Sequence, residues 1–191
     1  MKKFILILLV ILFSGCADKE RIVTNANGEA KTYQFFLKQN YNPEQYTLNL
    51  KNGDSKITIV VTKDKSFYQV TNKENTTQII EKDGYKHTID FDMKSYTTEL
   101  IMDLTNYSLG YLPKDMEKLK TESYKTGKDK LTYEEYVYQG GSTTYYFKGD
   151  KLKHIKNKTS LNETTVSFVS ISSKIDKKLF DLPKDYQEIT Y

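Results

Sequence analysis

Residues 46–61, YTLNLKNGDSKITIVV, decide the fold of this chain. Apolar side chains occupy alternate positions on both sides of the turn signal Asn52-Gly53, and polar residues fill most of the positions between them. A period of two is typical of a strand with one buried face, and Asn-Gly between two such runs predicts a hairpin. The alternating apolar positions are Tyr46, Leu48 and Leu50 before the turn and Ile57, Ile59 and Val61 after it.

The same alternation recurs along most of the chain. Asp83-Gly84, Gly140-Gly141 and Gly149-Asp150 are further turn signals between strand-like runs. Sixteen tyrosines and nine phenylalanines in 191 residues also favour strands over helices. These patterns predict a long antiparallel meander that opens with a strand over Lys31–Lys38 and forms a single domain over residues 31–191.

One stretch departs from the period of two. Leu100, Ile101, Leu104 and Tyr107 follow helical spacing, with Ser95 as an N-cap and Gly110 as a stop. A second helical turn is expected over Pro113–Leu119. The predicted fold class is therefore mainly β with one or two helices (α+β).

The N-terminus carries an export signal. Lys2 and Lys3 precede the apolar run Phe4–Phe13, which is too short to span a bilayer. Ser14-Gly15-Cys16 follows, and Cys16 is the only cysteine of the chain. Phe13-Ser14-Gly15-Cys16 resembles the lipobox of bacterial lipoproteins, which implies cleavage between Gly15 and Cys16 and a diacylglyceryl group on the Cys16 thiol. A plain secretory signal and a membrane anchor helix are the alternatives.

This interpretation sets the domain organisation and the location. Residues 1–15 are the lipoprotein signal peptide, residues 16–30 the lipidated N-terminus and a flexible tether, and residues 31–191 the folded domain. The expected location is the outer face of a bacterial cell membrane, or an outer membrane if the source cell has one.

The formal net charge is +4, with lysines and acidic residues interspersed, so the sequence lacks the basic stripe of nucleic-acid-binding proteins.

The layout of the chain resembles the LolA/LolB-like superfamily of lipoprotein carriers. The resemblance rests on a helix near the middle, on the hairpin Thr144–Leu152 and on the closing Leu179–Tyr186, which contains Phe-x-Leu-Pro-x-x-Tyr. It implies a strongly curved antiparallel sheet, an incomplete β-barrel closed by a central helix, that holds acyl chains in its concavity. An arginine gates the cavity in that family, whereas the sole arginine here, Arg21, lies in the predicted tether, so the gate is not carried over.

These observations lead to two hypotheses for a non-enzymatic protein without metal or cofactor. The first is a binder or carrier of a hydrophobic or lipid ligand. The second is a binding or sensor subunit of a cell-envelope protein complex, acting through its surface. A hydrolase is disfavoured because no nucleophile–base set is visible, and His87 on an apolar strand face is expected to be structural. The candidate cavity lining comprises Tyr85, Ile89, Phe91, Leu100, Ile101 and Leu104.

Overall fold

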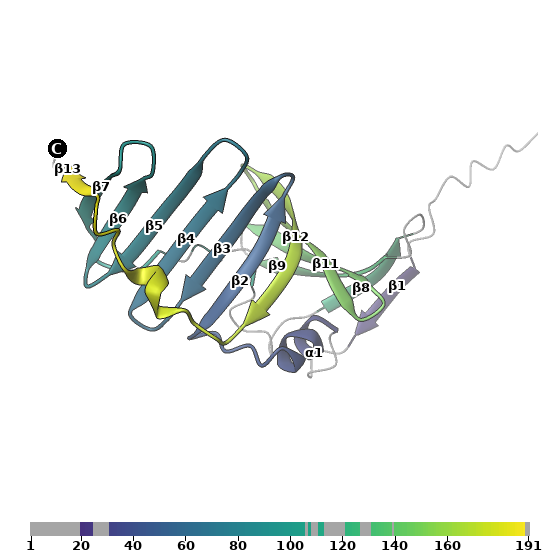
Figure 1. The fold of residues 1–191 in the computed structure, drawn as a ribbon. Coiled ribbons are helices and arrows are strands. Elements are labelled where there is room, and N and C mark those ends of the chain that lie inside the picture. The colour runs from purple at the N-terminus through teal and green to yellow at the C-terminus, as the bar shows by residue number, and fades with distance from the viewer. Residues whose placement is uncertain are drawn as a thin grey trace, which may run out of the picture.

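The computed structural model describes residues 20–24, 31–105, 107, 111–112, 121–126, 131–138 and 140–189. Within these residues, thirteen strands form one sheet, accompanied by the short helix α1 (Lys31–Lys38) and the 3-10 turn η2 (Lys177–Phe180) (Figure 1). The strands are β1 (Glu20–Thr24), β2 (Tyr46–Asn52), β3 (Ser55–Val61), β4 (Lys65–Thr71), β5 (Thr76–Lys82), β6 (Tyr85–Asp90), β7 (Ser95–Leu100), β8 (Thr121–Thr126), β9 (Leu131–Tyr138), β10 (Gly141–Lys148), β11 (Lys151–Thr159), β12 (Glu163–Ser172) and β13 (Gln187–Ile189).

Two antiparallel meanders build this sheet, in the order β1-β8-β9-β10-β11-β12-β2-β3-β4-β5-β6-β7-β13. One meander is β2–β7 and the other is β8–β12, and they join where β12 pairs with β2. β13 pairs with β7 in parallel, so the sheet is mixed. Among the described residues, β1 and β13 are the two edges and do not pair with each other, so the sheet is open.

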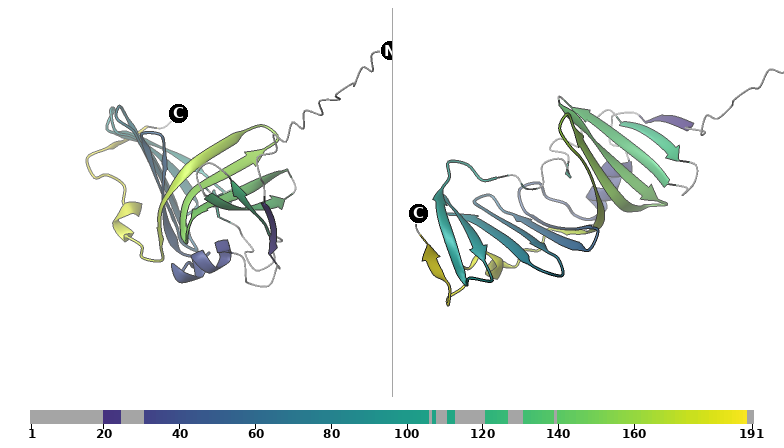
Figure 2. Two further views of the ribbon diagram at one scale, coloured as in Figure 1. Left: turned by 90° about the vertical axis from the view of Figure 1, so that its right-hand side faces the viewer. Right: turned by 90° about the horizontal axis from the view of Figure 1, so that it is seen from above.

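The sheet bends sharply between the two meanders (Figure 2). The register shifts between Phe168 and Ser170 where β12 meets β2, and again between Tyr146 and Phe147 where β10 meets β11. Such bulges add an unpaired residue and increase the local twist, which bends the strands. Helix α1 lies at this bend, against β11.

The larger apolar core lies between α1 and the bent sheet. Phe36 of α1 is fully buried and meets Tyr145 of β10 edge to face, with ring centroids 6.1 Å apart. Phe35 contacts Phe168 and Phe147 in the same geometry. The buried members from the sheet are Tyr46, Leu48, Leu50, Ile57, Ile59, Tyr136, Tyr145, Phe147, Leu152, Ile155, Val166 and Ile171.

A second, smaller core lies on the other face of the β2–β7 meander. Val60, Phe67 and Ile80 are cross-strand neighbours in one row, and Phe180 of η2 covers them. Because both faces are covered here, Ile59 and Val60 are both fully buried although their side chains point in opposite directions.

A buried carboxylate fastens α1 to the sheet. Glu134 of β9 is 2% exposed and accepts hydrogen bonds from the backbone N–H groups of Lys31 and Thr32, each at 2.7 Å, and from Thr32 Oγ1 at 2.6 Å. The first N–H groups of a helix have no partner within the helix. Glu134 therefore supplies a cap from a strand more than 100 residues away in the sequence.

The prediction of a mostly β fold is confirmed, and so are the turns, since Gly53, Gly84, Gly140 and Gly149 all have positive φ. The finer prediction, a curved antiparallel sheet forming an incomplete barrel closed by a central helix, is wrong. The sheet is mixed and open, and in the described part of the chain no central helix closes it.

Three segments differ from the predicted layout. Ser95–Leu100, expected to begin the central helix, is strand β7 and pairs with β6 along its whole length. Lys31–Lys38, expected to be a strand, is helix α1. Residues 20–24, inside the segment expected to be a tether, form strand β1 on β8. The second expected helical turn, Pro113–Leu119, lies outside the described residues, as does the signal segment with Gly15 and Cys16.

Replacing Glu134 by Gln should destabilise the fold by about 1–3 kcal/mol, because a neutral amide makes weaker hydrogen bonds and places a donor against the N–H groups of α1. Chemical denaturation measures the change, and amide exchange should show the loss of protection within Lys31–Lys38. The matched control is Glu135→Gln on the neighbouring position of the same strand, which removes the same charge from a partly exposed side chain. Equal losses in both variants would contradict the capping role.

Candidate functional site

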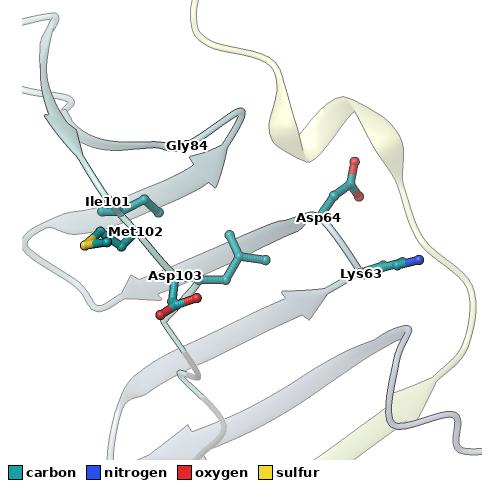
Figure 3. Close-up of a pocket in the computed structure, with 7 residues that line it drawn as sticks. Lys63, Asp64, Gly84, Ile101, Met102 and Asp103 are labelled. Atoms are coloured by element: carbon teal, nitrogen blue, oxygen red, sulfur yellow. The ribbon is translucent and has the colours of Figure 1, made fainter.

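An open pocket of about 400 Å³ lies at one end of the β2–β7 meander (Figure 3). Two turns and the segment that follows β7 form it. The backbone N–H of Ile101 donates to the carbonyl of Gly84 at 2.9 Å, which joins that segment to the β5–β6 turn. The lining residues are Lys63, Asp64, Gly84, Ile101, Met102, Asp103 and Leu104.

The pocket combines apolar and charged side chains. Ile101 and Leu104 are partly buried and provide the apolar lining, while Lys63, Asp64 and Asp103 provide charges of both signs at its rim. Met102 is 99% exposed, and a flexible thioether side chain adapts to different apolar partners. A surface of this kind suits non-covalent binding of an amphiphilic group.

The segment after the pocket is fastened by a second buried carboxylate, Glu81 of β5. Glu81 is fully buried and accepts hydrogen bonds from Ser66 Oγ at 2.8 Å, from the Thr105 N–H at 2.6 Å and from Tyr107 Oη at 2.9 Å. Burial pushes the pKa of this carboxyl up, but the hydrogen bonds outweigh burial and hold the pKa below its ordinary value of 4.5. Glu81 is therefore an ionised group that holds Thr105 and Tyr107 against the sheet.

Tyr107 is held by both of its ends. Its ring stacks on Tyr68 of β4, with centroids 4.8 Å apart, while its hydroxyl donates to Glu81. Burial, followed by the hydrogen bond to Glu81, raises the pKa of Tyr107, so the phenol keeps its proton at neutral pH. This contact fixes the position of the chain just beyond the pocket.

The six residues predicted to line a cavity are dispersed. Ile101 and Leu104 line the pocket. Tyr85 and Leu100 are cross-strand partners on β6 and β7 and are 45% and 77% exposed. Ile89 is only 3% exposed, and Phe91, in the turn after β6, packs edge to face on Tyr186.

His87 is structural in its contacts. It lies beside Ile80 and Thr98 in the sheet and its Nδ1 is 3.1 Å from Thr98 Oγ1. Burial, and then the charge of Lys82, lower the pKa of His87, while Glu188 and Asp83 act in the opposite direction.

Within the described residues, no three His, Cys, Asp or Glu side chains are placed to hold a metal ion. In that same part of the chain, no helix is long and apolar enough to cross a bilayer.

Comparison with known proteins adds little. No protein-family model matches the chain, and no curated protein matches it. Among solved structures, an uncharacterized conserved protein from Thermus thermophilus is similar with a TM-score of 0.48 and 8% sequence identity, over 84% of this chain and 99% of that one. A likeness of this degree carries no inference about function.

Glu81 predicts an acid-sensitive contribution to stability. Because its pKa is lower in the folded protein than in the unfolded chain, its ionised form stabilises the fold above the unfolded pKa, and this stabilisation is lost as pH falls through the folded pKa. The free energy of unfolding should therefore fall from about pH 5 downward, and Glu81→Gln should flatten that fall. Glu74→Gln, in an exposed turn, is the control. A pH profile in Glu81→Gln that matches the unsubstituted protein would contradict this role.

Proposed function

We propose that this protein is a lipoprotein of the bacterial cell envelope, held on the outer face of a membrane by lipid on Cys16. The observation that carries the proposal is the order of features at the N-terminus: Lys2-Lys3, the apolar run Phe4–Phe13 and the single cysteine directly after Ser14-Gly15. Two acyl chains on one cysteine suffice for stable membrane attachment, whereas one chain attaches only marginally.

The proposed activity is non-enzymatic binding of a second envelope protein through the pocket surface. Two features support it. The pocket combines an apolar lining with charges of both signs, as the core and rim of protein interfaces do. Met102 in its lining and Leu100 next to it are 99% and 77% exposed, and contiguous exposed apolar surface is typical of interaction sites.

A small amphiphilic ligand is the second candidate for the same pocket. A volume of about 400 Å³ falls within the range of small-molecule sites, and Ile101 and Leu104 provide an apolar wall. Native mass spectrometry after incubation with bacterial lipid extract separates the two candidates. A bound lipid that Leu104→Asp abolishes would favour the carrier, and an empty protein would favour the protein partner.

The anchor predicts that Cys16→Ser moves the protein from the membrane fraction to the soluble fraction when the membranes of cells that express it are washed with high salt. Mass spectrometry of the N-terminal peptide should show that the unsubstituted protein begins at a diacylglyceryl Cys16. Retention of Cys16→Ser on membranes washed with high salt, which removes electrostatic attachment, or a mature N-terminus at another residue, would contradict the anchor.

The partner surface predicts position-specific crosslinking in cells. A photo-crosslinking amino acid at position 102 should give one discrete adduct with an envelope protein. The matched control is position 161, since Leu161 is 96% exposed and lies in the β11–β12 turn, distant in strand order from the pocket. An adduct pattern that is the same at both positions, or no adduct at position 102, would contradict the proposed surface.

A further inference from the structure

A second pocket, of about 460 Å³, lies between α1 and the β10–β11 turn. Positions 31, 34, 35 and 38 follow helical spacing and form one face of α1, which makes one side of the pocket. The turn makes the other side. The lining residues are Lys31, Gln34, Phe35, Lys38, Gln39, Asp150 and Lys151, and we call this the α1 pocket.

The α1 pocket is basic. Three lysines and one aspartate line it, so its formal charge is +2. Lys31 is partly oriented, because its Nζ lies 3.4 Å from Asp150 and 5.5 Å from the ring centre of Phe147. Lys38 and Lys151 are exposed to solvent. Glu134 already accepts the first N–H groups of α1, so it is the lysine side chains that make this surface attractive to anions.

Strand register places the α1 pocket at the same end of the sheet as the start of β1. Glu20 pairs with Lys125, Lys125 with Thr132, and Thr132 with Phe147, the residue beneath Lys31. Three strand spacings of about 4.8 Å therefore separate Glu20 from Phe147, roughly 14 Å in total. Cys16 lies four residues before Glu20, and four residues span at most about 14 Å. A lipid on Cys16 thus brings this edge of the sheet to the bilayer surface.

We propose that the α1 pocket is a membrane-contact site that binds the headgroups of anionic phospholipids. The inference rests on the proposed function, because it is the lipid anchor at Cys16 that brings the lysines within reach of the headgroups. Anionic headgroups complement the charge of the pocket. Each lysine near an anionic bilayer surface adds roughly a fivefold gain in affinity. The site orients the anchored domain, with α1 toward the membrane.

The test uses the mature chain, residues 16–191, carrying Cys16→Ser, so that no acyl chain contributes to binding. Its partition is measured on neutral phosphatidylcholine vesicles and on the same vesicles with phosphatidylglycerol added. We expect binding only to the anionic vesicles, weakening as salt rises. Replacing Lys31, Lys38 and Lys151 by Gln should lower affinity at least about tenfold. Replacing Lys51, Lys56 and Lys73 by Gln removes the same charge from the β2–β7 meander and should change affinity less than about threefold.

No binding to the anionic vesicles, or equal losses in the two triple variants, would overturn the proposal. Because Lys31 also pairs with Asp150, Lys38→Glu is the second variant; Lys38 is exposed, and this change alone should lower affinity roughly fivefold or more. Unchanged binding of Lys38→Glu would also overturn the proposal. Failure here is separable from failure of the anchor, since acylation of Cys16 is read by mass spectrometry on the lipidated protein.

Discussion

The buried carboxylate of Glu134 and its hydrogen bonds to the start of α1 are the interaction on which the architecture depends. A buried carboxylate is costly unless donors satisfy it, and the Lys31 and Thr32 N–H groups and the Thr32 hydroxyl do so. An eight-residue helix is marginal in isolation, so α1 depends on this cap and on burial of Phe36. Once α1 is fixed at the bend, Phe36 fills the space between the two meanders. Gln34 and Lys38, on the opposite face of the helix, are exposed to solvent. Glu81 repeats the same chemistry in the other meander, where it holds Thr105 and Tyr107.

The sequence pattern predicted the features that depend on residues close together in the chain. Alternation around Asn52-Gly53 predicted the β2–β3 hairpin, and the glycines of the turns have the positive φ that such turns require. Helical spacing of Leu100, Ile101 and Leu104 was misleading, because pairing of Ser95–Leu100 with β6 decides the structure and leaves Leu100 exposed. Lys31–Lys38 was predicted to be a strand but is a helix, because Glu134 caps its first turn from a distant strand. No signal near position 31 points to a residue 103 positions away. Of the six residues predicted to line a cavity, only Ile101 and Leu104 line a common pocket. The basic α1 pocket could not be predicted from the sequence, because its lining comes together only when residues 31–38 form a helix.

The two meanders of the sheet carry pockets of different chemistry. The α1 pocket is basic and shares a sheet end with the start of β1, whereas the pocket at Ile101–Leu104 carries charges of both signs and lies in the other meander. A lipid on Cys16 and lysines on α1 would act on the same bilayer, one by burial of hydrocarbon and the other by electrostatic attraction. In that arrangement the exposed Leu100 and Met102 remain available to a partner, since seven strand pairings separate β10 from β6.

The orientation of the anchored domain is the central claim, and fluorescence quenching tests it most directly. Because a thioether occupies the Cys16 sulfur of the lipidated protein, Leu37→Cys and Met102→Cys each introduce one free thiol for a fluorescent label, at positions that are 50% and 99% exposed. The lipidated variants are placed in vesicles that contain phosphatidylglycerol and a headgroup-labelled quencher lipid. We predict strong quenching of the label at position 37 on α1 and little quenching at position 102. Equal quenching at the two positions, or stronger quenching at position 102, would contradict the account.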